Sequence, residues 1–361
     1  MQLIRYVKSP MNSKLVKLSV VCGVLAASLA TGLAADKSYD QMSKSELVAL
    51  LKQRDAQTKA APCKMTSKCP TSGKEMKALT EPEKLSSPFG AIVFTGLDMF
   101  TGSYNSDWPG SFGAKIGANL GYLILPEQGL GVQAGASAGI YDWNGHSGGD
   151  HNSSSQGQYF VTTGLFYRGP VDSIFKAGVV YDAMFNNNLG VDQQDPFLNQ
   201  IRWQAGARVY GKHEVGVWGA QALNTDRTMD SNSTYAFRAV SHASLYYSYA
   251  FANGAEIFLW GGVPYEGSLA NNGHPAGSFV SGLRASVPIS GNFSLFAEAG
   301  YMKSQQPSGY NASVSNAESV TIGVSYGFGG QPNTEGRNMP LIPVANNSTF
   351  ITDSSFNNGP E

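Results

Sequence analysis

The feature that most constrains the fold is a run of segments in which apolar residues alternate with polar residues or Gly, from Ser87 to Phe328. No helical period persists over this range. Because successive side chains of a strand point to opposite faces, a period of two predicts β-strands. We predict twelve strands, at 89–100, 111–123, 130–142, 158–168, 173–185, 200–210, 214–223, 236–250, 255–264, 278–289, 292–302 and 317–328.

The connections between these segments are alternately short and long. Longer polar connections, such as 144–156, separate the tight turns. This asymmetry is typical of transmembrane β-barrels, which have short periplasmic turns and long external loops. A soluble secreted β-sandwich is the alternative, and it would not require detergent. The predicted tight turns are 126–129, 169–172, 211–213, 252–254 and 290–292.

Aromatic residues gather at both ends of the predicted strands, as in the two interfacial girdles of a membrane barrel. Rows of Ala, Val, Leu and Ile between them suit contact with lipid. One predicted girdle is Tyr122, Tyr167, Phe175, Tyr249, Phe251, Phe293, Tyr326 and Phe328, and the other is Phe100, Tyr104, Phe112, Tyr141, Phe185, Tyr265 and Tyr301.

The first 35 residues read as a signal peptide, with four basic residues before an apolar run and small residues at a cleavage site after Ala34. Residues 36–87 form a Lys-rich periplasmic tether. Within it, Ser43 and Glu46 make a capping box that predicts a short helix over 43–57. The barrel follows at 88–328, and residues 329–361 are expected to be a periplasmic C-terminal tail. Both termini are thus predicted to be periplasmic.

Cys63 and Cys69 are the only cysteines of the mature chain. In an exported protein such a pair can form a disulfide, which is the interpretation we favour. Zinc is the alternative, but two ligands fall short of the usual four. We predict no metal and no cofactor.

Composition argues against binding to nucleic acid. Only 14% of the residues are charged, and beyond the signal peptide 21 basic residues face 26 acidic ones. No basic surface for nucleic acid is therefore expected.

Charged residues of the strands fall on the face opposite the lipid-facing rows. A lumen of twelve strands is wider than the eight-stranded barrels that side chains fill and narrower than open porins. We therefore favour a narrow channel for small solutes. The alternative is a non-conducting structural or adhesive barrel, in which these charges pair and plug the lumen. The predicted pore-lining residues are Lys115, Lys176, Asp182, Arg202, Arg208, Glu214, Arg238, Glu256, Arg284 and Glu298.

A third possibility is an outer-membrane hydrolase. It would require His146, Asp150 or His151 of one long loop to meet a nucleophile at the rim. No complete catalytic motif is present, so we predict no catalytic residues and no enzyme.

The segment 318–328 resembles the final strand of bacterial outer-membrane β-barrels. The matching positions are Thr321, Gly323, Tyr326 and Phe328. The resemblance implies an outer-membrane location, contact with membrane lipid, and recognition of this strand by the barrel-assembly machinery. The segment Met339–Phe350 is similar to tails of uncharacterised, porin-like barrel families. Neither the solute nor the oligomeric state follows from these patterns.

Overall fold

The structure is a computed structural model. All the residues that it describes belong to one compact unit, Glu81–Glu361. Among the described residues, no helix is long and apolar enough to cross a membrane. The predicted signal peptide, tether helix, Cys63, Cys69, His146, Asp150 and His151 lie outside the described residues. Those described are 87–102, 110–142, 155–170, 173–190, 193–230, 233–270, 274–304, 316–332 and 336–358.

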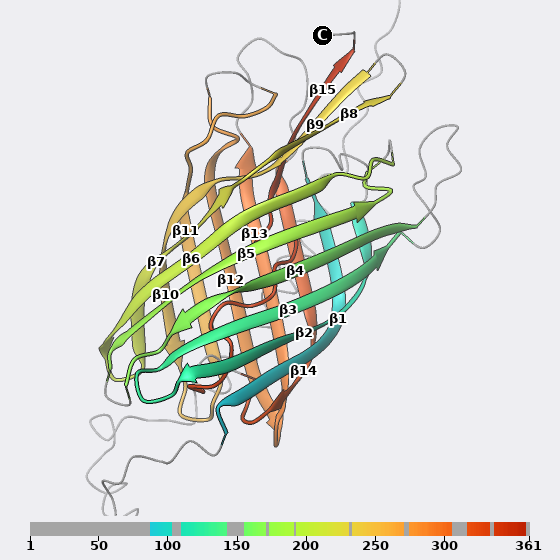
Figure 1. The fold of residues 1–361 in the computed structure, drawn as a ribbon. Coiled ribbons are helices and arrows are strands. Elements are labelled where there is room, and N and C mark those ends of the chain that lie inside the picture. Colours follow the sequence, from blue (N-terminus) through green and yellow to red (C-terminus); the bar gives the residue numbers. More distant parts are fainter. Residues whose placement is uncertain are drawn as a thin grey trace, which may run out of the picture. The chain divides into compact units, whose positions relative to one another are not determined.

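Within these residues, twelve antiparallel strands close into a barrel (Figure 1). Pairing of the first and last strands closes it, in a register that runs from Ala91 opposite Phe328 to Thr101 opposite Glu318. Closure satisfies the backbone groups that an open edge would expose to lipid. The strands are β1 Phe89–Thr101, β2 Ser111–Leu125, β3 Leu130–Tyr141, β4 Gln156–Tyr167, β5 Phe175–Asn187, β6 Phe197–Tyr210, β7 His213–Ala222, β10 His242–Ala250, β11 Glu256–Pro264, β12 Gly277–Ser290, β13 Phe293–Ser304 and β14 Ala317–Phe328.

The all-β antiparallel barrel predicted from the sequence is confirmed, and short turns collect at one end and long connections at the other. One predicted strand, 236–250, is wrong because it contains two strands. Its first part belongs to β9 (Ser233–Ala239), which leaves the barrel, and only β10 stays in the wall. The chain changes direction at Val240, whose N–H donates to the Ile351 carbonyl at 2.8 Å.

A separate three-stranded sheet extends from the long-loop end of the barrel (Figure 1). Its order is β15–β9–β8, with β8 at Thr225–Asp230 and β15 at Thr352–Asn358. Arg238 of β9 lies opposite Asp353 of β15, and their side chains approach to 3.7 Å. Burial raises the pKa of the Asp353 carboxyl, although the N–H of Leu269 donates to it at 2.7 Å.

The outer face of the barrel is apolar. Exposed aromatic side chains include Tyr122, Phe175, Phe293 and Phe328 near the short turns, and Phe112, Phe185 and Tyr265 near the long loops. Two residues predicted for the outer girdle, Phe100 and Tyr141, are instead buried in the lumen, where their rings meet edge to face at 5.1 Å. They share strand faces with Asp98 and Gln133, so alternation points them inward.

The segment after β14 differs most from expectation. We predicted a periplasmic tail at 329–361, but the chain turns back into the barrel. It enters at the short-turn end, where the Asn338 amide donates to the Phe89 carbonyl at 2.8 Å. It leaves at the long-loop end as β15. The described chain therefore begins and finishes at opposite ends of the barrel, and residues 336–351, the lumen segment, run between them (Figure 1).

Replacing Ile116 with Lys tests the lipid-facing assignment. Ile116 is 65% exposed in the middle of β2. A lysine there should lower the free energy of unfolding by about 2–4 kcal/mol, because it meets hydrocarbon at the midplane. Val209→Lys, one residue from the short-turn end of β6, should cost about 0–1 kcal/mol. Denaturant titration in lipid vesicles measures both, and equal losses would contradict the assignment.

Candidate functional site: the occupied lumen

The lumen segment runs through the barrel in an irregular path, with turns at Gly336–Met339 and Asn346–Phe350. Pro340 and Pro343 lack the N–H that a strand ladder requires, so the segment cannot join the wall as a further strand. Wall side chains take the place of a neighbouring strand. The Gln133 amide donates to the Ile342 carbonyl at 2.6 Å and accepts from the N–H groups of Leu341 and Ile342 at 3.1 Å each.

Further side chains of the wall satisfy the backbone on either side of Gln133. Arg168 donates to the carbonyls of Met339 and Pro340 at 3.1–3.2 Å. The Thr162 hydroxyl accepts from the N–H of Ala345 at 3.0 Å. Buried backbone groups are costly when they lack partners, so these contacts make the segment compatible with the barrel interior.

Glycines let the segment approach the wall closely. A Cβ added at Gly121 would lie 2.5 Å from the Asn338 carbonyl oxygen, and one at Gly90 would lie 2.7 Å from the same atom. Real Cβ atoms do not approach backbone so closely. Glycine is therefore required at both positions for the segment to enter as it does.

Apolar residues of the segment complete the core. Leu341 and Ile342 pack with Leu123, Phe166 and Val180. At the long-loop half, Val344, Ala345 and Phe350 join a larger cluster that includes Leu198 and Phe237. In the described part of the chain, the lumen segment thus contributes side chains to two buried apolar clusters of the barrel interior.

Asp182 and Arg202, both predicted to line a pore, form a fully buried ion pair. The guanidinium meets the carboxylate through Nε and through Nη2, the latter at 2.9 Å. Thr162 and Gln200 donate to the same carboxylate at 2.7 and 3.2 Å. Arg202 also donates to the Pro343 carbonyl at 2.8 Å, so this pair holds the lumen segment as well as its own strands.

Lys115 and Glu298 belong to a second charged cluster with Asp98. The Lys115 ammonium lies 3.7 Å from Asp98 and 3.9 Å from Glu298, and it donates to Thr321 at 2.9 Å. The segment enters this cluster through two amides. Asn346 donates to Glu298, and Asn347 donates to Asp98 at 3.0 Å.

The remaining predicted residues are distributed as follows. Lys176 and Glu214 pair at 2.7 Å, and Tyr246 donates to Glu214 at 2.7 Å. Arg208 lies on the lumen face of β6, opposite Glu214. Glu256 and Arg284 line a cavity in the short-turn half of the barrel.

Arg238 is a correction, because it does not line the lumen. It lies in β9, outside the barrel wall, and pairs with Glu266 at 3.0 Å and Asp353 at 3.7 Å. Its segment reads as a strand continuous with β10, but the chain uses it to build a hairpin over the long-loop end.

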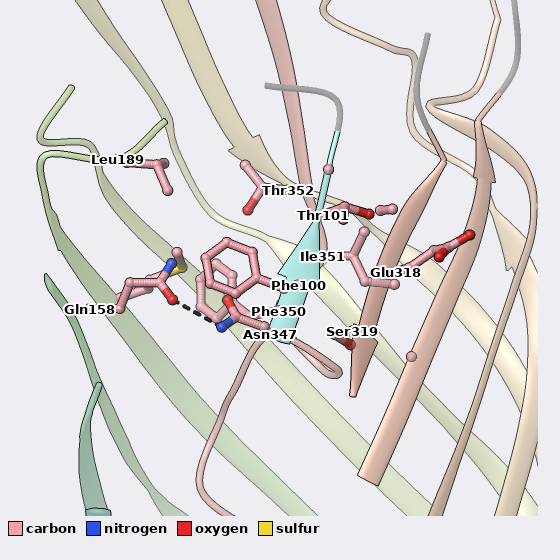
Figure 2. Close-up of a pocket in the computed structure, with 14 residues that line it drawn as sticks. Phe100, Thr101, Gln158, Leu189, Glu318, Ser319, Asn347, Phe350, Ile351 and Thr352 are labelled. Carbon is pink, nitrogen blue, oxygen red and sulfur yellow. Dashed lines mark hydrogen bonds between the residues drawn. The ribbon is translucent and has the colours of Figure 1, made fainter. Parts of the chain in front are cut away.

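A small pocket of about 50 Å³ lies at the long-loop mouth. Figure 2 shows the Asn347 amide reaching the Gln158 amide across it, a hydrogen bond of 2.9 Å. Phe100 of β1 and Phe350 of the lumen segment contribute apolar walls. The pocket is therefore bounded by the segment itself.

The four residues of the predicted assembly signal all lie in β14. Thr321 is fully buried and donates to Asp98. Gly323 lies on the same inner face of β14 as Thr321. Tyr326 and Phe328 lie on the outer face, where their rings are 4.8 Å apart.

Sequence reasoning missed residues that hold the lumen segment, chiefly Gln133 and Thr162. One signal was available. The chain carries no charged residue between Arg337 and Asp353, and that run contains Met, Leu, Ile and Val separated by prolines. Such a stretch suits a buried position better than a solvated tail. No group of three or more potential metal ligands occurs among the described residues.

Residues 90–352 match a protein family described as a family of unknown function, DUF6666. The chain belongs to this family. The matched range contains the barrel, β8, β9 and the whole lumen segment. No curated protein sequence matches the chain significantly.

Several solved barrels are similar in fold alone. Outer membrane phospholipase A from Escherichia coli has a TM-score of 0.39 and 13% identity over 65% of this chain and 95% of its own. For the translocator domain of autotransporter NalP from Neisseria meningitidis, the TM-score is 0.36 and the identity 15%, over 78% and 97%. The TodX monoaromatic hydrocarbon channel has a TM-score of 0.36 and 11% identity, over 66% and 88%.

The closed antiparallel wall, its apolar exterior and its polar interior are the properties of a bacterial outer-membrane β-barrel. This confirms the resemblance seen in the final strand and the outer-membrane location. The lumen of this barrel contains a segment of the chain itself.

Replacing one member of the buried pair tests its contribution. Arg202→Met leaves Asp182 as an uncompensated buried charge and should cost about 3–5 kcal/mol of unfolding free energy. The double variant Asp182→Leu with Arg202→Met should recover part of that loss. Denaturant titration of the variants gives the coupling energy. Additive losses would show that the two side chains act independently.

Replacing Gly121 with Val tests the path of the lumen segment. The added side chain would collide with the Asn338 backbone, so the segment should dock less completely and expose Arg337. Trypsin should then cleave after Arg337 at least tenfold faster than in the native protein. Gly102→Val is the matched control, because a Cβ there meets nothing within 4 Å. Unchanged cleavage of the Gly121 variant would contradict the path.

Proposed function

We propose that the protein is a non-conducting barrel that displays the β8–β9–β15 sheet at the cell surface as a structural or adhesive element. The observation that carries this proposal is the lumen segment, which runs from one end of the barrel to the other and is bonded to the wall by Gln133, Arg168, Thr162 and Arg202.

The charges of the lumen support the same proposal. Asp182 pairs with Arg202, Lys176 with Glu214, and Lys115 lies between Asp98 and Glu298. Charges engaged in this way bind one another rather than a passing ion. The channel that the sequence favours needs a continuous wet path, and the segment occupies that path.

The proposal includes an orientation. Short turns of such barrels face the periplasm and long loops face outward. In this orientation the chain enters β1 from the periplasm, and the C-terminal strand β15 reaches the outside through the lumen. The periplasmic C-terminus expected from the sequence is replaced by an external one.

Two further parts of the proposal concern chemistry and partners. The role is non-enzymatic, since it requires only display and occlusion. Membrane lipid contacts the apolar outer face, and the assembly machinery reads β14, whose Tyr326 and Phe328 point outward.

Planar-bilayer recording tests the proposal. The full-length protein should insert without discrete conductance steps. A variant ending at Gly330 lacks the lumen segment and should show steps, because an empty twelve-stranded barrel is wider than side chains alone fill. Heat-modifiable mobility in gels confirms that the shortened barrel has folded.

Steady conductance of the full-length protein would overturn the proposal and support the narrow channel instead. A folded variant ending at Gly330 that never conducts would show that wall side chains close the lumen without the segment.

A further inference from the structure

Arg284 and Glu298 occupy directly opposed positions on β12 and β13. Opposite charges at such positions ordinarily pair across the strands. Here no ion pair within 4.0 Å joins them in the described structure. Glu298 turns toward Lys115 and Asn346, whereas the Arg284 guanidinium lies 4.7 Å from the Phe258 ring centroid on the other neighbouring strand.

A cavity of about 100 Å³ adjoins both side chains. This volume has room for roughly seven water molecules or a small organic molecule. Its apolar walls include Ile92, Phe94 and Phe296 of the barrel. Leu341 and Val344 of the lumen segment form the facing wall.

The charged groups of the cavity are one cation and two carboxylates. Among the described residues, Arg284 makes no hydrogen bond, and its guanidinium has five N–H donors in a geometry that matches a carboxylate. Glu256 is buried and accepts a hydrogen bond from the Ser248 hydroxyl at 3.5 Å. The carboxylates of Glu256 and Glu298 each have several acceptor positions, so both can take a further donor.

We propose that this cavity binds a small zwitterion that carries a carboxylate and an ammonium group on an apolar body, of the size of an aliphatic amino acid. Arg284 binds the carboxylate, Glu256 and Glu298 face the ammonium, and the aromatic and aliphatic walls contact the apolar part. A simple anion would lie beside two carboxylates, which repel it. A simple cation would leave Arg284 without a partner.

The inference rests on the proposed occlusion, because the lumen segment supplies one wall. Pro340, Pro343 and Asn346 also line the cavity. A bound zwitterion therefore contacts both the barrel and the segment, and it stabilises the segment inside the lumen by mass action.

Isothermal titration calorimetry of the full-length protein in detergent tests the site. The probes are L-valine, 3-methylbutanoate, which lacks the ammonium, and 2-methylpropylamine, which lacks the carboxylate. Valine should bind at least tenfold more tightly than either analogue. Arg284→Gln should weaken valine binding at least tenfold and leave the amine unaffected, whereas Glu256→Gln should weaken both.

Arg208→Gln is the matched control, since Arg208 lies on the lumen face but not in the cavity, and its valine affinity should equal that of the native protein. Each variant is first checked for heat-modifiable mobility. Absence of valine binding, equal binding of 3-methylbutanoate, or an unchanged affinity in Arg284→Gln overturns the assignment. Bilayer recording without ligand reports occlusion separately, so a conducting protein that binds valine would contradict only the proposed function.

Discussion

Hydrogen bonds from wall side chains to the backbone of the lumen segment are the interaction on which the rest of the interior depends. A twelve-stranded barrel encloses more space than its own side chains fill, and a chain entering that space must satisfy every backbone group it buries. Gln133 does this for Leu341 and Ile342 with one amide. The apolar side chains of the segment can then pack into the clusters that the wall leaves incomplete.

The segment does not fill the lumen evenly. The side chains that bind its backbone come mainly from β3, β4 and β6, through Gln133, Thr162 and Arg202. The larger cavity lies on the other side, against β1, β11, β12 and β13. This asymmetry explains why Arg284 remains without a hydrogen-bonding partner in the described structure while Arg202 is fully enclosed.

Most of the wall could be predicted from the sequence because its determinants are local. Lys115 was correctly placed inward by alternation alone, and the alternating short and long connections set the topology. Phe100 and Tyr141 were misplaced because their position near the strand ends was given more weight than the face they share with Asp98 and Gln133. Arg238 was misplaced because nothing local marks where β9 leaves the wall.

The charged residues of the lumen could be named from the sequence, but their partners could not. Asp182 and Arg202 lie 20 positions apart, and their pairing depends on the register between β5 and β6. The lumen segment is the stronger case, since Gln133 and Ile342 are separated by 209 positions. The sequence by itself determined a barrel with an apolar exterior and a polar interior, because a period of two acts residue by residue. Only the tertiary structure decided what occupies that interior, because occupancy depends on the width of the closed barrel and on contacts between its wall and the far end of the chain.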